Sequence, residues 1–445
     1  MYISHKQAES SNFEFVIIGS GVAGISLAIE LEKLNKKILL IEAGEKEFSE
    51  NSQDFYKGTV LGDKYYNLKD ARLRMFGGSS NHWAGWCKSL DDYDFNNKNY
   101  INNKWAIDST DLVKFEKKTE KILELDKKKK DINLSENFKQ VFFQNSPPVN
   151  FNTKYLKKII ESKNIFLLLD TTIYNFQLNQ NTIISAEGFF KDKTKCSFNG
   201  KNFFLCCGGI ENSRILLYSN KLNNNNLVFN NKILGTHWME HPHGWVGMAI
   251  MDTKKLGLKE ITYKNQDVSF IAPRKSFLDK NKLLNSCFRF FKVDKNNFKK
   301  KLLLSLPSYY LKSLFQKHTF HAYRIYCASE QLPSINNKIS LSNKTDQFSL
   351  PRAQLEWRKN QLDLKTIKEP LVSLGKYFVD NNIGRIQLND KLAKNEFPNS
   401  DLGGYHHMGG TRMAIDPNKG VVDKNLKVFG KKNFFILGSS VFPSG

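Results

Sequence analysis

Apolar and polar positions near the N-terminus predict a strand, a loop and a helix, followed by a second strand. Phe13–Ile18 reads FEFVII, a short apolar run typical of a buried strand. Residues 25–34 then place apolar side chains at helical spacing, and Lys37–Ile41 is a second apolar run that ends at Glu42. Strand, loop, helix and strand in this order predict a βαβ unit.

The loop between the first strand and the helix carries three glycines in the pattern GxGxxG. Gly19 allows a tight turn, Gly21 lets the backbone approach a pyrophosphate, and Gly24 lets helix and strand pack closely. The helix N-terminus offers free N–H groups and a positive dipole end to a phosphate. Glu42 follows Gly24 by 18 residues, a spacing that suits a hydrogen bond to an adenosine ribose. The unit therefore predicts a dinucleotide site, without choosing between FAD and NAD.

A second glycine-rich loop brings polar side chains among aromatic residues. Residues 72–87 read RLRMFGGSSNHWAGWC, and small residues with side-chain donors suit a surface that lies against a flat ring or a phosphate. A generic turn anchored by Trp83 is the alternative, but it does not explain polar side chains beside so many aromatic residues. The loop residues that we expect at a site are Gly77, Gly78, Ser79, Asn81 and His82.

A third glycine-rich segment, residues 403–413, reads GGYHHMGGTRM and carries two adjacent histidines, His406 and His407. Flanking glycines let backbone and ligand approach closely. Adjacent side chains point in different directions, so we expect only one of the two to face a site. We predict no metal site, because zinc takes three or four ligands and no Cys or carboxylate partner is near in sequence. The apolar run Phe434–Leu437 is a buried-type strand, with the Gly438–Ser439 loop after it.

The middle of the chain has a different pattern. Residues 246–399 alternate strand-like apolar runs with polar segments and show helical periodicity at 363–379. This pattern predicts a domain with a mixed or antiparallel sheet covered by helices. The strand-like runs are Trp245–Met251, Val268–Ala272, Phe320–Cys327, Ile339–Leu341 and Gln354–Trp357.

Composition and charge exclude several classes of function. The 445 residues include 67 Lys and Arg against 44 Asp and Glu, but this basic excess is spread along the chain without a nucleic-acid-binding motif. We therefore expect no nucleic-acid partner. The six Cys include no CxxC pair, which disfavours a redox dithiol. No apolar stretch reaches the roughly 18–20 residues of a membrane span, and we expect a cytoplasmic protein.

Residues 298–317, FKKKLLLSLPSYYLKSLFQK, combine basic and apolar side chains. Such a segment suits the surface of an anionic membrane, which would place the protein at the inner membrane face. Pro307 interrupts any helix there, and a basic-edged helix pair that packs on the body is the favoured interpretation. Peripheral membrane contact is kept as the alternative.

Five segments in order resemble the glucose–methanol–choline (GMC) oxidoreductases, FAD-dependent enzymes that oxidise alcohols, and the resemblance covers nearly all of the chain. One such motif alone is weak, whereas five in the correct order are highly specific. The segments are GSGVAG…IEAG from Gly19, RLRMFGGSSNHWAG from Arg72, FFLCCGGIENSRILL from Phe203, LGTHWMEHPH from Leu234 and HHMGGTRMAIDPNKGVVDKNLKVFG…LGSSVFP from His406.

The resemblance implies a fold class, a cofactor and a reaction. The fold class is α/β (α+β overall), with a discontinuous Rossmann-like FAD-binding domain and a substrate domain on a mixed or antiparallel sheet. The reaction is oxidation of a CH–OH group of a sugar, polyol or related alcohol by hydride transfer to flavin N5. His407, the His of the HxxGT pattern, is the implied general base. The implied domains are 1–95, 150–245 and 400–445 for FAD, 96–149 for a helical connection or cap, and 246–399 for the substrate.

The resemblance also assigns further residues to the cofactor. Gly208 in the returning strand-and-turn segment, and Gly438 and Ser439 in the last loop, are expected to contact FAD. His82 stands where some members attach the flavin covalently; a non-covalent contact is favoured, and covalent attachment is the alternative. His241 is interpreted as a structural residue that fixes a turn before a proline, with a ligand contact as the alternative.

Two departures from the family pattern leave alternatives open. Gly438 stands where members usually carry an Asp, and the family's second active-site Asn or His would lie beyond Gly445, so we expect the chain to lack the family's C-terminal end. The alternatives are an incomplete or non-catalytic FAD-binding chain and a basic membrane-surface-associated flavoprotein. A disulfide-reductase-type flavoprotein would need a redox Cys pair and a second GxGxxG, and the sequence has neither. The electron acceptor stays open among oxygen, a quinone and a carrier protein.

Overall fold

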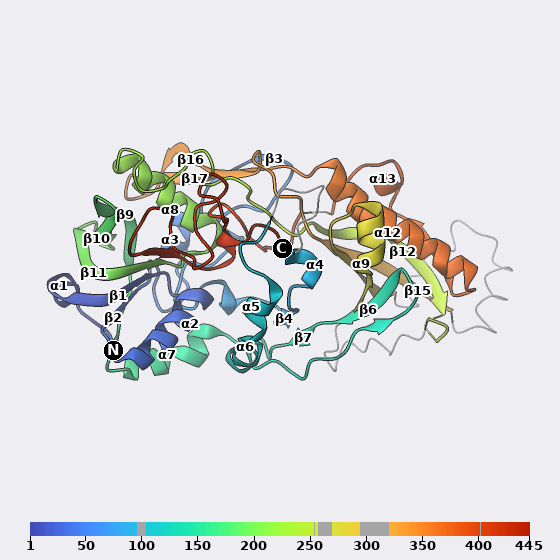
Figure 1. The fold of residues 1–445 in the computed structure, drawn as a ribbon, viewed down its shortest axis with the longest axis horizontal. Helices are drawn as coiled ribbons and strands as arrows, with labels where there is room; N and C mark the ends of the chain where they lie inside the picture. Colours follow the sequence, from blue (N-terminus) through green and yellow to red (C-terminus); the bar gives the residue numbers. More distant parts are fainter. Residues whose placement is uncertain (96–103, 253, 257–268, 294–319, 401) are drawn as a thin grey trace.

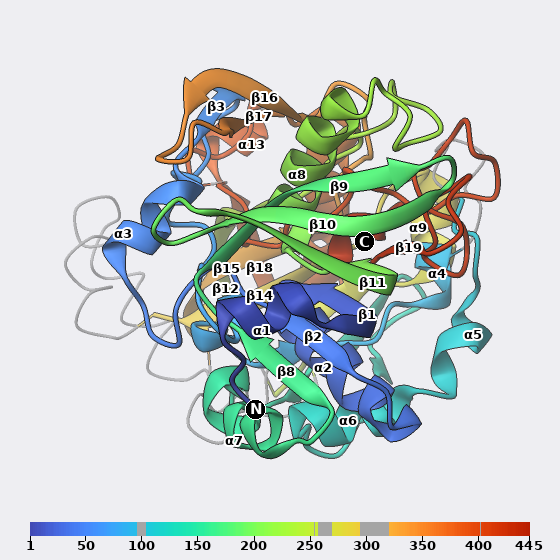
Figure 2. The ribbon, with the colours of Figure 1, turned by 90° about the vertical axis from the view of Figure 1, so that its left-hand side faces the viewer.

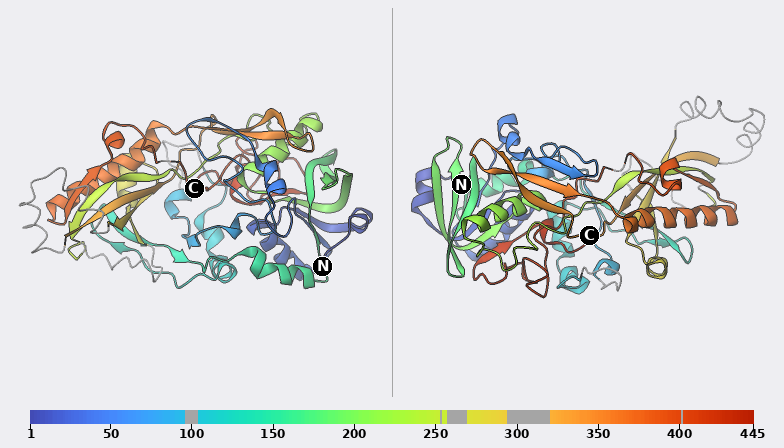
Figure 3. Two further views of the ribbon diagram at one scale, coloured as in Figure 1. Left: turned by 180° about the vertical axis from the view of Figure 1, so that it is seen from behind. Right: turned by 90° about the horizontal axis from the view of Figure 1, so that it is seen from above.

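The computed structural model describes residues 1–95, 104–252, 254–256, 269–293, 320–400 and 402–445. The molecule is elongated, with a sheet toward each end and the C-terminal residue between them (Figures 1 and 3). Residues 298–317, predicted to form a helix pair or to contact a membrane, lie outside the described residues. Within the described ranges, no helix combines the length and the apolar character needed to cross a membrane.

The predicted βαβ unit forms the middle of a largely parallel sheet, seen in the foreground of Figure 2. Its strands, in spatial order, are β8 (Ile165–Leu168), β2 (Ile38–Ile41), β1 (Asn12–Ile18), β11 (Lys195–Leu205), β10 (Thr182–Phe190) and β9 (Thr171–Asn179), with β19 (Phe434–Ile436) also beside β11. The neighbours β8, β2, β1, β11 and β19 pair in parallel. Strands β10 and β9 continue from β11 as an antiparallel meander.

Alternate residues of this sheet pack into two different cores, which explains why β2 is apolar throughout. Ile38 and Leu40 share one core with Ile25, whereas Leu39 and Ile41 share another with Leu216. The helices that supply these cores are α2 (Val22–Leu31), α7 (Phe151–Glu161) and α8 (Gly208–Leu222). Helices therefore cover both faces, and the predicted Rossmann-like α/β fold is confirmed.

The second sheet lies at the other end of the molecule and is antiparallel throughout. Its strands, in spatial order, are β18 (Gly384–Leu388), β12 (His243–Asp252), β15 (Phe320–Ser329), β14 (Ser286–Lys292), β13 (Ser269–Pro273), β6 (Phe138–Phe142) and β5 (Ile132–Asn133). The long helix α12 (Gln361–Asp380) packs Leu371 and Phe378 against Phe288 and Ile325 of this sheet. An Asn360–Asp363 capping box begins this helix. The predicted antiparallel sheet covered by a helix is thus confirmed.

A small third sheet joins distant parts of the chain. It contains β16 (Lys338–Thr345), β17 (Pro351–Trp357) and β3 (Thr59–Gly62), and β17 pairs with β3 in parallel. Ile339 and Trp357 pack with Ile210 of α8 in one core. Strands β16 and β17 fall inside the range predicted for the substrate domain, but they lie against a helix of the first sheet, and β3 falls inside the range predicted for FAD.

Residues 96–149, predicted to form a helical connection, contribute strands as well as helices. Strand β6 reads FKQVF, with four of its five residues buried, and it pairs with β13 in the second sheet. This run is too short and too apolar on both faces for an exposed connecting helix, although the domain boundaries themselves stay a prediction. The helices in the described part of this region are α5 (Ser109–Val113) and α6 (Glu116–Leu123), and α4 (Asp92–Phe95) comes just before it. The remaining elements are α1 (His5–Ser10), η1 (Glu32–Leu34), α3 (Glu50–Gln53), η2 (Asp54–Tyr56), η3 (Gly78–Asn81), β4 (Trp86–Cys87), β7 (Gln144–Asn145), α9 (Lys275–Asn281), α13 (Asp390–Ala393) and η4 (Ser439–Val441).

Candidate active site

A cavity of about 480 Å³ lies beside the parallel sheet, where several predicted site residues meet. Segments far apart in the sequence form its walls, among them the loop after β1, the loop before η3, the start of α8 and the loop after β19. The predicted residues that line it are Gly19, Gly21, Glu42, Gly78, Ser79, Gly208, His407, Gly438 and Ser439.

The three glycines of the first loop have different surroundings. A Cβ on Gly19, whose φ is +100°, would lie 2.6 Å from the carbonyl oxygen of Cys206, and one on Gly24 would lie 1.9 Å from the carbonyl oxygen of Gly19. Both positions therefore require glycine because backbone already fills the space. By contrast, no other atom of the described chain lies within 4 Å of a Cβ built on Gly21, which faces the cavity. Gly21 leaves room for a ligand.

Glu42 is buried at the end of β2, and the loop of Ser20 holds its carboxylate. Oε2 accepts hydrogen bonds from the backbone N–H of Ser20 at 3.0 Å and from its hydroxyl at 2.6 Å. Oε1 accepts from the N–H of Gly44 at 2.8 Å. Since each carboxylate oxygen has two lone pairs, Oε1 keeps acceptor capacity for a ligand hydroxyl.

The second loop approaches the first one. A Cβ on Gly78 would lie 3.2 Å from the Cα of Gly21, so these two glycine loops are in close contact. Asn81 folds back and donates to the carbonyl oxygens of Phe76 and Gly78, both at 2.9 Å. His82 is exposed. The described residues that line the cavity do not include Gly24, Gly77, Asn81 or His82.

His407 lies where the last two segments meet, and it lines the cavity. A Cβ on Gly209, at the start of α8, would lie 2.4 Å from the carbonyl oxygen of His407. The Ser439 hydroxyl donates to that same carbonyl oxygen at 2.6 Å. Backbone contacts from α8 and from the loop after β19 therefore fix the position of this histidine.

A hydrogen-bonded chain runs from His407 to a buried carboxyl group. His407 Nε2 lies 3.0 Å from the Tyr65 hydroxyl, which donates to Glu240 Oε2 at 2.5 Å. Glu240 Oε1 accepts from the backbone N–H groups of His241 at 2.9 Å and His406 at 2.7 Å. Sequence reasoning missed Tyr65 and Glu240, since Tyr65 is 342 residues from His407 and 175 from Glu240.

Burial shifts the pKa values of the two ionisable groups at the ends of this hydrogen-bonded network, Glu240 and His407. It raises the pKa of Glu240 to about 7, although the bonds from Tyr65 and the backbone oppose that shift. Burial, with the positive charge of Arg72, lowers the pKa of His407 to about 3. His407 therefore carries a neutral imidazole at neutral pH, with one ring nitrogen free of a proton.

Buried charges form another wall of the cavity. Arg72 bonds Glu211 at 2.7 Å, and Arg214 bonds both Glu211 at 3.1 Å and Asp346 at 2.5 Å. In the described part of the chain, the Nε and Nη1 atoms of Arg72 have no hydrogen-bond partner. An unpaired buried guanidinium edge suits an anionic or carbonyl-bearing ligand. The sequence analysis assigned no role to Arg72, although it flanks the second glycine loop.

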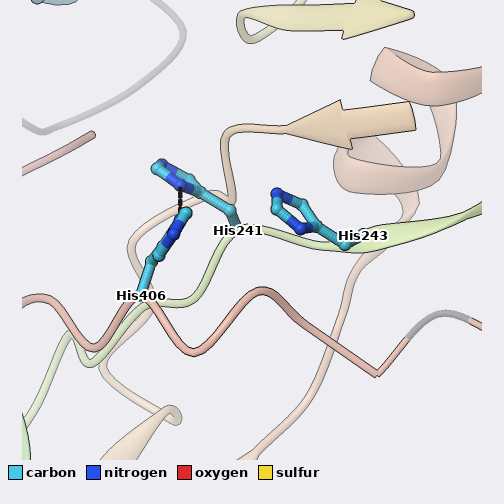
Figure 4. Close-up of side chains that lie close together, drawn as sticks. All are labelled: His241, His243 and His406. Carbon is cyan, nitrogen blue, oxygen red and sulfur yellow. Dashed lines mark hydrogen bonds between the residues drawn. The ribbon is translucent and has the colours of Figure 1, made fainter. Parts of the chain in front are cut away.

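The two adjacent histidines do point apart, as expected. His407 lines the cavity, whereas the ring of His406 turns toward His241, with 2.8 Å between their Nδ1 atoms. The ring of His243 lies beside them, with its centroid 5.5 Å from that of His406 (Figure 4). His241 thus contacts other histidines in addition to preceding a proline in the turn.

Comparison with known proteins adds family and fold information. Residues 333–445 match the family model described as GMC oxidoreductase. The chain is 22% identical over 309 residues to the fructose dehydrogenase large subunit of Gluconobacter japonicus, covering 66% of this chain and 53% of that one. It is 24% identical over 141 residues to the 2-methyl-1,2-propanediol dehydrogenase of Mycolicibacterium austroafricanum, covering 30% and 23%. The matches thus span about half or less of the length of these curated relatives.

Two solved structures share the fold at 16% sequence identity. Pyridoxine 4-oxidase from Mesorbium loti has a TM-score of 0.64, with 97% of this chain and 95% of that one covered. Formate oxidase of Aspergillus oryzae has a TM-score of 0.57, with coverage of 98% and 94%. At this level of identity the likeness establishes the arrangement of both sheets and carries no substrate with it.

Proposed function

The chain belongs to the GMC oxidoreductase family, and on this premise we propose that it is an FAD-dependent oxidoreductase of CH–OH groups with His407 as general base. The expected substrate is a sugar, a polyol or a related small alcohol. One observation carries the proposal: a single cavity is lined both by the dinucleotide-type loop of Gly19 and Gly21 and by His407. A cofactor and a proton acceptor then share one space.

The residues around the cavity fit FAD. No other atom of the described chain lies within 4 Å of a Cβ on Gly21 or on Gly208, so the backbone there forms an open cradle. Glu42 offers a carboxylate oxygen to a ribose, and Arg72 offers unpaired N–H groups to an anion or carbonyl. When bound, FAD supplies the hydride acceptor.

The chain's own residues supply the proton chemistry and the positioning. The neutral imidazole of His407 takes up the proton of the substrate hydroxyl group. Ser439 holds the backbone of His407, and the Tyr65 hydroxyl holds its ring at Nε2. Glu240 in turn orients Tyr65. A base held at its backbone and at its ring keeps its orientation between turnovers.

Replacing His407 tests the proposal. We expect the His407→Ala variant to retain FAD, because the substitution leaves the glycine loops unchanged. Its rate of flavin reduction should fall by at least about 100-fold, the scale of general base catalysis. Anaerobic bleaching of the flavin absorbance with a panel of sugars and polyols measures this rate. The control is His5→Ala, which removes an exposed histidine of α1 that lies outside the cavity.

The outcomes separate the proposals. Normal bleaching in His407→Ala would remove the base assignment, while wild-type protein that binds FAD but is never bleached would favour the non-catalytic alternative. For reduced wild-type protein, reoxidation by oxygen, a quinone or a carrier protein then identifies the acceptor.

We further propose that FAD is held non-covalently, because His82 is exposed and is not among the described residues that line the cavity. Mass spectrometry of the denatured chain should show no added flavin mass.

A further inference from the structure

Three histidines outside the cavity converge from two separate segments of the chain. His241 and His243 flank a proline at the start of β12, and His406 comes from the segment that leads into His407. One ring nitrogen from each of the three lies within 4.8 Å of the others. Figure 4 shows the His406 ring meeting the ring of His241, with the His243 ring beside them. We propose that these three side chains bind a divalent first-row transition-metal ion, with Zn²⁺ as its representative.

The local backbone explains why the three rings meet. Residues two apart in an extended segment point to the same side, and the rings of His241 and His243 lie nearly parallel, at 15°. Glycine at position 404 lets the other segment approach, because a Cβ there would lie 2.5 Å from the ring of His243. His406 is held from behind by its backbone N–H, which donates to Glu240 at 2.7 Å. The cluster is therefore a consequence of chain packing.

The spacing of the nitrogens suits coordination. Zinc–imidazole bonds of about 2.1 Å in a tetrahedral site place two nitrogens about 3.4 Å apart. This value falls between the 2.8 Å that separates the Nδ1 atoms of His241 and His406 and the 4.8 Å limit of the group. Ring movements of about 1 Å therefore suffice to bring the nitrogens to coordinating positions.

The surroundings resemble the outer shell of a metal site. The Nε2 edge of the His241 ring lies beside Gly445, whose backbone hydrogen-bonds the ring, and this contact leaves Nδ1 to face the cluster. Glu240 accepts hydrogen bonds from the backbone of both His241 and His406, so a carboxyl group lies directly behind two of the ligands. The backbone of two of the three proposed ligands is therefore held at one buried carboxyl group.

The ligand set indicates which ion and which coordination. Imidazole suits Zn²⁺, Cu²⁺, Ni²⁺ and Fe²⁺ better than it suits Ca²⁺ or Mg²⁺, which prefer oxygen. Three protein ligands leave a fourth position open for water or another ligand, and His406, one of the three, is exposed. Because His406 precedes His407, an ion bound here would link the segment that carries the proposed base to the histidines at the start of β12. The sequence missed this site, since 165 residues separate His241 from His406.

Zinc titration tests the site without reference to catalysis. The full chain, stripped with EDTA and desalted, is titrated with Zn²⁺ against a chromophoric chelator, while its flavin content is read separately from absorbance. We expect one Zn²⁺ per chain in the wild type and in the control His5→Ala. Loss of an outer-shell partner weakens metal sites by about 10–100-fold, so loss of a ligand in His243→Ala or His406→Ala should weaken binding by at least about 100-fold.

Two further measurements keep the test decisive. If an alanine variant does not fold, His243→Gln keeps the side-chain volume close to that of His and is judged by the same titration. X-ray absorption of the zinc-loaded wild type counts imidazole ligands directly, and three are expected. Failure of the wild type to take up Zn²⁺, unchanged affinity in the histidine variants, or fewer than three imidazoles would each overturn the proposal.

Discussion

The parallel and antiparallel sheets contribute to the candidate site in different ways. The strands β1, β11 and β19 are parallel neighbours, so the loops at their carboxyl ends meet at one edge and bring together Gly19, Gly208 and Gly438. None of the described residues that line the cavity belongs to the antiparallel sheet. That sheet acts from outside the cavity, through Glu240 and the histidines that enter β12. The order of the parallel strands thus brings the cavity-lining loops together, whereas the residues that lead into the antiparallel sheet contribute through hydrogen bonds and ring contacts.

The largest expected effect comes from a pair of glycines in the parallel half. In Gly24→Ala the new Cβ meets the carbonyl oxygen of Gly19 at 1.9 Å, so we expect loss of folded, FAD-containing protein. In Gly21→Ala the Cβ meets no described atom within 4 Å, and φ is −74°, which alanine adopts freely. This variant should keep its melting temperature but bind FAD at least about 10-fold more weakly, about 1.4 kcal/mol. Full FAD affinity in Gly21→Ala would show that the cofactor lies elsewhere.

A core substitution in the antiparallel region tests whether its stability and FAD binding by the parallel region are independent. Leu371 of α12 is 0% exposed, and Leu371→Ala should lower the free energy of unfolding by about 2–5 kcal/mol. Its neighbour Val372 is 49% exposed, and Val372→Ala should change that free energy by no more than about 0.5 kcal/mol. Thermal and urea unfolding measure both variants. We expect the folded fraction of Leu371→Ala to keep its FAD, and loss of FAD below its melting temperature would mean that the halves are coupled.

The smallest effect concerns the contact between the halves. Tyr65→Phe removes the hydroxyl between His407 and Glu240, and it leaves Glu240 Oε2 short of a donor at a cost of about 1–3 kcal/mol. We expect flavin reduction to slow by about 10–100-fold at unchanged FAD content, measured by anaerobic stopped flow. Tyr66→Phe is the matched control, because the Tyr66 hydroxyl donates to the backbone carbonyl oxygen of Gly403 at 3.3 Å, whereas the Tyr65 hydroxyl links His407 to Glu240. Equal rates in the two variants would remove the positioning role of Tyr65.

The sequence predicted the parts of the fold that depend on local pattern. Apolar runs located β1, β2, β12, β15 and α12, because the periodicity of a buried strand or helix is visible within a short window. The second parallel neighbour of β1 could be inferred only through resemblance, since β11 lies far along the chain, and so does β19, which pairs with β11. The run 138–142 was missed as a strand of the second sheet, because its partner β13 is more than a hundred residues away.

In the candidate site, too, the sequence predicted residues that belong to local motifs and missed those that act through distant contacts. The glycines and His407 are marked by motifs, so the sequence identified them, although motif membership did not separate lining residues from supporting ones. Gly24 and Asn81 belong to the motifs, yet they support backbone and do not line the cavity. Arg72 and Glu240 lie within quoted motifs and Tyr65 does not, but all three act through contacts at long separation, which the sequence alone does not show.

The pairing of β11 with β19 affects how the protein is made. Residues 203–205 of β11 keep an unpaired edge until residues 434–436 leave the ribosome, and β3 likewise waits for β17. At about 5–20 residues per second, synthesis of the roughly 230 residues between β11 and β19 takes roughly 12–46 s. Throughout that time the nascent chain presents an open strand and half of a cofactor cradle. The FAD cradle is therefore complete only once β19 and the loop of Gly438 have joined the sheet, so we expect FAD to bind after residues 434–439 have emerged.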